Sequence, residues 1–371
     1  MHETKANSDL ASNEGDQAYL RLQYPKIADV LVWPELVEAF RQHEDTAKRL
    51  KLGSRRNCLF SIGSIVLSLA TTLVGTSPMF APLVSGHPAG AYVVAVASFL
   101  LLVLALLFGN GILYGRKRDD WLKHRLIAER LRHFYFQTIL ANLSSICCGS
   151  SLERRRFIED RGRTLERVLR RLRSPGYRQA VLGDEALQEA RLVDFGEVNA
   201  EAIDAEYFQE LEQYWIELRF NWQGEYATQQ LARKASALPF SGSLADQEHS
   251  VSRIEFITTA GIVALQALAV AGMFIYAPGS PVIEGSMLGA SILAILVVGL
   301  QAFKDGLGLT NDLSRNRVYA SYTAKLLRDF VSAQRIPDRA AQVRIMQEME
   351  DLAYFETREF LYTHSTARFS L

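Results

Sequence analysis

The chain has 371 residues, with 41 Lys and Arg and 41 Asp and Glu, so its formal net charge is zero. This balance gives no general electrostatic reason to bind nucleic acid, and we expect no nucleic-acid partner. Three cysteines, Cys58, Cys147 and Cys148, are too few for a disulfide framework and lack the spacing of a zinc site. The charges are segregated, because four long stretches contain almost none of them.

The first 32 residues are predicted to form a disordered or poorly ordered tail. Residues 1–17 are polar and include Lys5, Asp9, Glu14 and Asp16. They have no apolar core, which excludes a signal peptide in this segment. Any membrane insertion must therefore come from internal hydrophobic segments.

Four uncharged stretches are predicted to cross a membrane as helices. About 20 apolar residues at 1.5 Å each span a hydrocarbon core of about 30 Å. The four stretches contain no Asp, Glu, Lys or Arg, and one such charge at mid-span costs roughly 3 kcal/mol. They are residues 58–77, 90–114, 256–277 and 286–303. The fold class is therefore an all-α integral membrane protein with cytoplasmic helices.

The spans pair into two tight hairpins that enter from the same side. The connecting turns are short and rich in proline, which suits a chain that has left its helix. The turn residues are Pro78, Pro82 and Pro88 in the first hairpin and Pro278, Gly279 and Pro281 in the second. Basic residues flank the outer ends instead, as in Lys48, Arg49, Lys51, Arg55 and Arg56 before the first span. By the positive-inside rule both termini are cytoplasmic.

Polar residues within the spans are the candidate functional groups of the membrane region. Ser61, Ser64, Ser68, Thr72 and Gly75 recur at steps of three or four and share one face of the first span. This face either lines a narrow aqueous path or lets two helices approach closely. Gln266 and Gln301 are expected to face inward, because an amide at membrane depth needs a partner or water.

An arginine-rich segment is followed by an acidic one in the predicted cytoplasmic region. The two segments either neutralise each other on the surface, or the arginines bind an anionic lipid surface or nucleotide. Arginine suits phosphate because its planar fork donates two parallel hydrogen bonds. The candidate anion or lipid contacts are Arg154, Arg155, Arg156, Arg163, Arg167, Arg170 and Arg171.

The sequence contains no recognisable catalytic pattern. Its seven histidines are scattered without metal-ligand spacing, and neither a phosphate-binding glycine loop nor a Gly-x-Ser-x-Gly elbow occurs. We therefore expect no enzymatic activity, no metal and no cofactor. The pattern favours a membrane protein that acts by assembly.

Short motifs beside the spans repeat in the two halves and resemble a known family. Ala128-Glu-Arg-Leu-Arg132 and Ala324-Lys-Leu-Leu-Arg328 lie at the same offset as the starts of the second and fourth spans. With Trp121, His124-Arg125 and the segment Tyr214-Trp-Ile-Glu-Leu-Arg219, these motifs resemble tandem SLATT domains, from about Trp33 to the C-terminus. The resemblance implies one module over residues 33–180 and a second over residues 181–371.

The resemblance to SLATT domains also implies a function. These two-transmembrane modules accompany nucleotide second-messenger synthases and SLOG nucleotide sensors in bacterial conflict systems. A member would lie in the lipid bilayer of the inner membrane, form a homo-oligomer, and permeabilise the membrane when a nucleotide signal or partner protein triggers it during phage infection. The alternative is a non-conducting membrane scaffold that anchors a cytoplasmic signalling partner.

Overall fold

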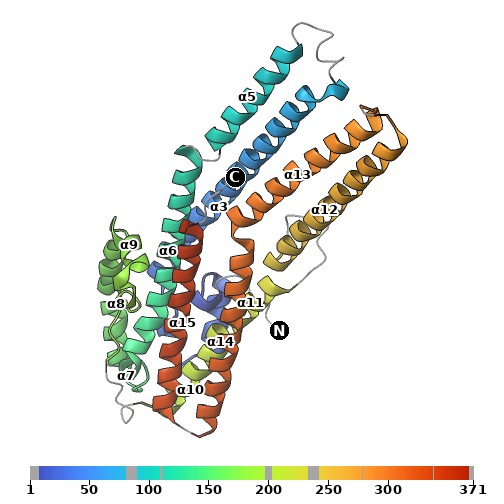
Figure 1. Ribbon diagram of the computed structural model, residues 1–371. Coiled ribbons are helices and arrows are strands. Elements are labelled where there is room, and N and C mark those ends of the chain that lie inside the picture. The colour runs from blue at the N-terminus through green and yellow to red at the C-terminus, as the bar shows by residue number, and fades with distance from the viewer. Residues whose placement is uncertain are drawn as a thin grey trace. The chain divides into compact units, whose positions relative to one another are not determined.

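The computed structural model describes residues 8–80, 90–108, 112–196, 203–232, 242–277, 279–336 and 338–366. Throughout these residues the regular elements are helices, which confirms the all-α class. The chain divides into two compact units, each built from segments far apart in sequence (Figure 1). We call residues 1–48, 121–231 and 313–365 the helical unit, and residues 49–120, 232–312 and 366–371 the membrane unit.

The two units do not follow the predicted modules 33–180 and 181–371. Residues 181–190 belong to the helical unit together with residues 121–180. The two Ala-x-x-Leu-Arg motifs also lie in different environments, since Ala128 and Arg132 are buried whereas Ala324 and Arg328 are exposed. The folded units thus group the segments differently from the two modules, whose boundary at residue 180 stays a prediction.

The membrane unit contains the apolar helices. They are the later part of α3 (Pro34–Thr76), η2 (Pro78–Phe80), α5 (Gly90–Phe108), α12 (Leu244–Ile275) and α13 (Pro281–Leu307). Helices α3, α12 and α13 are long and apolar enough to cross a membrane, and α5 is a shorter apolar helix. The predicted span 90–114 includes residues 109–111, which lie outside the described residues.

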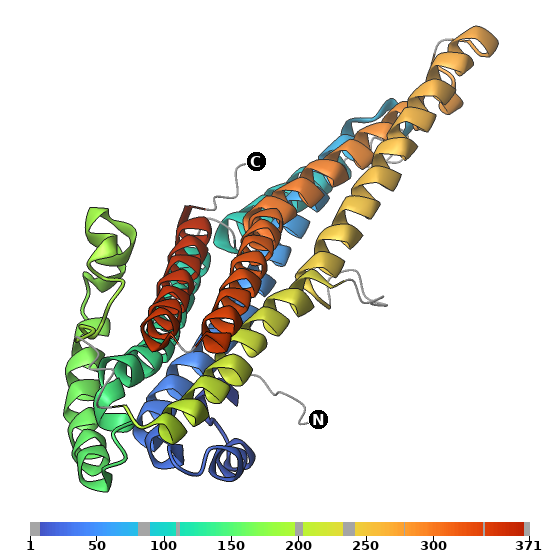
Figure 2. The same cartoon turned by 90° about the horizontal axis from the view of Figure 1, so that it is seen from below.

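Local sequence signals set the ends of the second hairpin. Ser243 caps α12 by accepting a hydrogen bond from the Asp246 N–H at 3.1 Å, and the Asp246 carboxylate accepts from the Ser243 N–H at 3.1 Å. Helix α13 begins with Ser280 as its cap and Pro281 in its first turn, and it ends at Gly308, whose φ of 64° is left-handed. Helices α12 and α13 then lie side by side (Figures 1 and 2).

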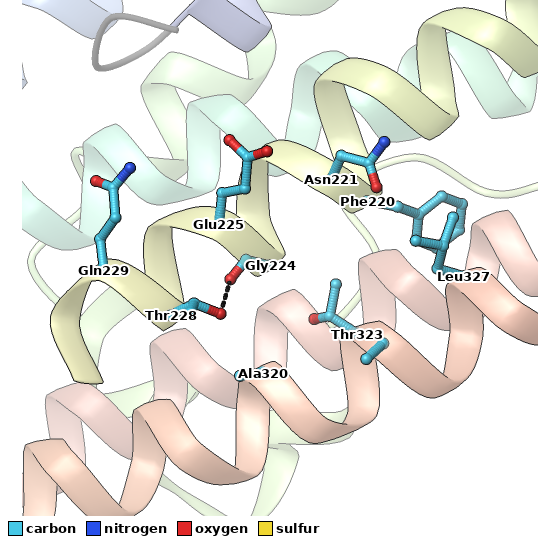
Figure 3. Close-up of a pocket in the computed structure, with 10 residues that line it drawn as sticks. Phe220, Asn221, Gly224, Glu225, Thr228, Gln229, Ala320, Thr323 and Leu327 are labelled. Carbon is cyan, nitrogen blue, oxygen red and sulfur yellow. Dashed lines mark hydrogen bonds between the residues drawn. The ribbon is translucent and has the colours of Figure 1, made fainter. Parts of the chain in front are cut away.

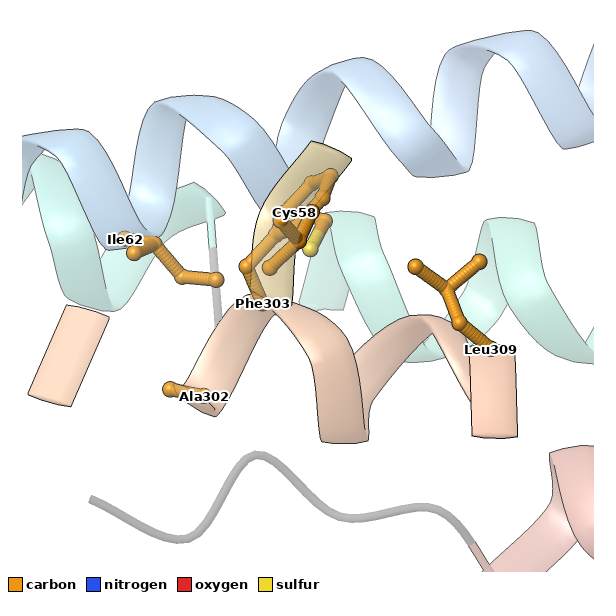
Figure 4. Packing of buried hydrophobic residues seen from close by; sticks show 6 residues of the cluster. Cys58, Ile62, Ala302, Phe303 and Leu309 are labelled. Atoms are coloured by element: carbon orange, nitrogen blue, oxygen red, sulfur yellow. The ribbon is translucent and has the colours of Figure 1, made fainter. Parts of the chain in front are cut away.

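A small apolar cluster packs helices of the membrane unit together where their apolar stretches adjoin charged residues. Cys58 and Ile62 of α3 pack there with Val251 of α12 and with Ala302 and Phe303 of α13 (Figure 4). Nearby, a Cβ placed on Gly299 would lie only 2.5 Å from Cγ2 of Val66, so the glycine lets α13 approach α3 closely. Outside this cluster the helices expose large apolar side chains, for example Phe256 at 74% and Phe274 at 87%.

The helical unit packs amphipathic helices around a buried interior. Its elements are η1 (Ser8–Leu10), α1 (Glu14–Gln23), α2 (Ala28–Leu31), the start of α3, most of α6 (Ile112–Ala141), α7 (Leu143–Ile146), α8 (Ser151–Leu172), α9 (Tyr177–Leu182), η3 (Asp184–Leu187), α10 (Ala205–Tyr214), the π-helix η5 (Trp215–Asn221), α11 (Trp222–Leu231), and most of α14 (Leu309–Arg335) and α15 (Arg339–Thr366). Aromatic side chains fill the interior, and Phe134, Phe136 and Trp215 are fully buried.

The N-terminal segment is folded from Ser8 onward, so the prediction of a disordered tail over residues 1–32 was wrong for its described part. Leu10, Ile27 and Leu31 are fully buried in the helical unit. The Arg161 guanidinium donates to the carbonyls of Val30 and Val32, both at 2.9 Å. The polar composition suggested disorder, but a few apolar residues are enough to fix this segment because the rest of the helical unit supplies the core in which they are buried.

Replacing Leu10 with alanine is expected to destabilise the helical unit by about 2–5 kcal/mol, because its fully buried side chain would leave a cavity. Thermal unfolding of the detergent-solubilised protein measures the change. The matched control is Leu22→Ala, since Leu22 is 76% exposed. Equal melting temperatures for the two variants would show that the segment is not part of the core.

Candidate functional site

The hydroxyl face of α3 is used for packing against α5. The Ser61 hydroxyl donates to the Ala105 carbonyl at 3.0 Å, and the Ser68 hydroxyl donates to the Ser98 carbonyl at 2.9 Å. Thr72 Oγ1 lies 2.7 Å from Ser98 Oγ. Ser61 and Ser68 are buried, so within one chain these two hydroxyls contact a neighbouring helix.

The remaining residues of this face differ from one another. A Cβ on Gly75 would lie 2.4 Å from Cγ1 of Val94, so the glycine allows close contact with α5. Ser64 is only partly buried, and no contact of its hydroxyl is seen within the described residues. Of the two functions that the sequence left open for this face, the contacts favour helix packing.

The two glutamines of the second hairpin do not face inward, contrary to the prediction. Gln266 and Gln301 are both exposed. Gln301 has Asp305 one turn away, with its Nε2 3.5 Å from both carboxylate oxygens. In the part of the chain that the structure describes, the Gln266 amide has no hydrogen-bond partner. The inner face of α12 is occupied by packing on α13, which leaves Gln266 on the outer side.

Of the seven candidate arginines of α8, one is buried and six are exposed. Arg154 is buried, lies 3.8 Å from Asp29 and stacks over the Tyr207 ring at 4.5 Å. Two of the exposed arginines form ion pairs at 2.8 Å, Arg163 with Asp160 and Arg171 with Glu189. The others are Arg155, Arg156, Arg167 and Arg170. The Arg171 contact joins the basic to the acidic segment, as the neutralisation hypothesis requires.

A chain of acidic and basic side chains runs through the interior of the helical unit, and the sequence did not predict it. Glu44 of α3 accepts from Arg125 at 2.8 Å, and Arg125 pairs with Glu129 at 2.5 Å. Arg132 pairs with Glu129 at 3.1 Å and with Asp9 at 3.2 Å. Burial raises the pKa of Asp9, and the facing Arg132 opposes that shift.

Two further arginines are buried near this chain. Arg219 of η5 lies 2.7 Å from Glu350 of α15, and its guanidinium is stacked on the Phe136 ring at 4.1 Å. Arg130 donates to the Tyr177 hydroxyl at 2.8 Å and to the Glu189 carbonyl. A sequence signal existed for these residues, because Glu129, Arg130 and Arg132 lie between the apolar residues 126–128 and the aromatic residues 134–136. Charges within an apolar run indicate buried pairing.

An open groove lies between α14 and the η5–α11 segment of the helical unit (Figure 3). Its volume is about 380 Å³, and Phe220 and Leu327 form apolar walls over a floor of small residues such as Gly224 and Ala320. Among its ten lining residues Glu225 carries the single formal charge. A negative lining repels phosphate, so this groove does not suit the phosphates of a nucleotide.

No protein-family model, curated protein or solved structure matches this chain. The candidate sites therefore depend on the geometry and chemistry of the residues themselves. Two features stand out: the paired hydroxyl face with the exposed Gln266 in the membrane unit, and the ionic interior of the helical unit. In the described residues no cluster of His, Cys, Asp or Glu has the geometry of a metal site.

A partly buried histidine pair is expected to make the stability of the helical unit depend on pH. His43 of α3 and His124 of α6 place their Nδ1 atoms 2.9 Å apart. Burial, and secondarily the neighbouring His124, lower the pKa of His43 to about 4. The unfolded chain, with a His pKa near 6.5, therefore binds protons more readily than the folded one between pH 6.5 and 4.

We expect the helical unit to lose about 1–2 kcal/mol of stability between pH 7 and pH 5 through His43, because stability falls as the pH drops through the unfolded value. The measurement is the melting temperature at both pH values for the wild type and for His43→Gln. The variant should show the smaller drop. Identical drops in both proteins would assign the pH dependence to other groups.

Proposed function

We propose that this chain is a membrane effector of a bacterial antiphage conflict system. In this proposal it lies in the inner membrane with both termini in the cytoplasm, oligomerises, and permeabilises the membrane when a nucleotide signal or a partner protein acts on the helical unit. The proposal includes α5 as a fourth span. Its 19 residues extend about 28 Å, close to the hydrocarbon thickness of about 30 Å.

The observation that carries the proposal is that α3 is one continuous helix with residues in both units. This single helix of 43 residues contains His43 and Glu44, which take part in the polar interior of the helical unit. The same helix contains Ser61 and Ser68, which pair with α5 in the membrane unit. A ligand that binds one arrangement of the interior more tightly would thus act on the helix that holds the apolar segments together.

The test is membrane potential in bacteria that express the chain, before and after phage infection. We expect depolarisation upon infection in cells with the wild-type chain. The matched controls are Leu268→Arg and Leu268→Ala, because Leu268 is exposed on α12 and an arginine at mid-span opposes insertion. The alanine variant should depolarise and the arginine variant should not. A steady potential with abundant inserted protein, before and after infection, would contradict the proposal.

A second candidate function is a non-conducting scaffold that anchors a cytoplasmic signalling partner. The observation that favours it is the use of Ser61, Ser68 and Thr72 in packing, since hydroxyls engaged with a helix are not lining water. A scaffold would leave the potential unchanged and would retain a cytoplasmic protein at the membrane. Fractionation of infected cells distinguishes the two functions.

A further inference from the structure

The outward face of α12 carries a regular seam. Six exposed residues recur at alternating intervals of three and four, which is the spacing of a helix that packs on a second helix over two heptads. The seam residues are Phe256, Thr259, Val263, Gln266, Val270 and Met273. The opposite face of α12 is already in contact with α13, where a Cβ on Gly261 or Gly289 would lie 3.0 Å from a leucine of the facing helix.

Gln266 lies at the centre of this seam and at the centre of the apolar segment. The last charges before it are Arg253 and Glu255, and uncharged sequence then continues past Ile275. Ten residues separate Gln266 from Phe256, which corresponds to about 15 Å, or half of the hydrocarbon thickness. A carboxamide at that depth cannot be solvated by lipid and gains free energy from any hydrogen-bonding partner.

The surface beside the seam is shaped for close contact. Ala260 and Ala267 are exposed on the side of the seam next to Val263, whereas Ala264 and Ala271 lie about 140–160° around α12 from Gln266. Small side chains let two helix backbones approach in a membrane, where packing and hydrogen bonds drive association. The small residues beside Val263 thus allow close approach on one side of the seam, and Gln266 lies at its centre.

We propose that this face pairs with the same face of a second copy of the chain, with Gln266 hydrogen-bonded to Gln266 of that copy. The inference rests on the membrane placement of α12 in the proposed function. Two copies inserted with one orientation carry their glutamines at equal depth, so a parallel, two-fold symmetric contact satisfies both amides at once. A different protein would have to supply its own polar group at mid-span. One polar residue in an apolar seam also fixes the register of the pair.

Cysteine cross-linking in native membranes tests this contact. In a chain without its own cysteines, Val263→Cys and Val270→Cys should form disulfide-linked dimers upon oxidation. The control is Leu268→Cys, which is similarly exposed but lies about 160° around the helix from Gln266. We expect several-fold more dimer at the two seam positions than at Leu268.

The role of the amide is tested in the chain with its natural cysteines, by energy transfer between copies that carry C-terminal donor and acceptor fluorophores. Gln266→Leu should lower the association constant about 3- to 10-fold, and Gln266→Asn should retain most of it. Equal cross-linking at Leu268, or energy transfer unchanged in Gln266→Leu, would overturn the inference. Neither readout depends on membrane potential, so dimers without depolarisation would contradict only the proposed function, and depolarisation without this contact only the inference.

Discussion

Replacing Arg219 with methionine is expected to destabilise the helical unit by about 3–5 kcal/mol, because it leaves the buried Glu350 carboxylate without its counter-charge. The two side chains are 1% and 0% exposed and lie 2.7 Å apart. Burial raises the pKa of Glu350 to about 7, although Arg219 opposes that shift, so the carboxyl depends on its partner to remain charged at neutral pH. Chemical unfolding of the solubilised protein measures the loss.

The double variant Arg219→Met with Glu350→Leu separates the cost of leaving the Glu350 carboxylate unpaired from the cost of removing the Arg219 side chain itself. Its destabilisation should be smaller than that of Arg219→Met alone, because no unpaired charge remains inside. Arg163→Met is the matched control, since Arg163 and Asp160 lie at a similar distance, 2.8 Å, but are 80% and 68% exposed, and such pairs contribute about 0–1 kcal/mol. Equal effects of Arg163→Met and Arg219→Met would contradict this account of the interior.

Replacing Ser68 with leucine is expected to separate α3 from α5 in the membrane unit. Ser68 is 1% exposed, and its hydroxyl lies 2.8 Å from that of Ser98, so a leucine would both overpack the contact and remove the hydrogen bonds. We expect a destabilisation of about 1–3 kcal/mol, plus the loss of a disulfide between Thr72→Cys and Ser98→Cys in membranes.

Ser64→Leu is the matched control for Ser68→Leu, because Ser64 lies one turn earlier on α3 and is only partly buried. It should retain the cross-link between positions 72 and 98. If Ser64→Leu abolished depolarisation while the cross-link persisted, the partly buried part of the face would line a conduit. If both leucine variants kept the cross-link, packing would not be the role of Ser68.

The helical class and the long apolar segments could be predicted because they depend on local composition. Uncharged stretches of about 20 residues, bounded by prolines and basic residues, produce apolar helices whatever surrounds them. The long helices α12 and α13 begin at Leu244 and Pro281, close to Ser243 and Ser280, which are recognisable caps. These signals required no knowledge of the tertiary structure.

The environment of individual polar residues could not be predicted, because it depends on contacts between distant segments. Arg154 and Arg155 are neighbours in sequence, yet the first is buried against Tyr207 and the second is exposed. Asp9 was assigned to a loose tail, although it meets Arg132 in the interior. Gln266 was expected to face inward on the correct argument that an amide needs a partner, but its own chain provides none among the described residues.

The interleaving of the two units imposes an order on biosynthesis. Residues 1–48 leave the ribosome first, yet the helical unit that they complete also requires residues 313–365. At roughly 5–20 residues per second, the intervening chain takes on the order of tens of seconds to make. During that interval Asp9, Glu44 and the arginines of α6 lack part of their final surroundings, although the apolar helices have already been synthesised. In the proposed function insertion would therefore precede completion of the helical unit, and a ribosome that stalls before residue 313 would leave apolar helices without the unit proposed to control them.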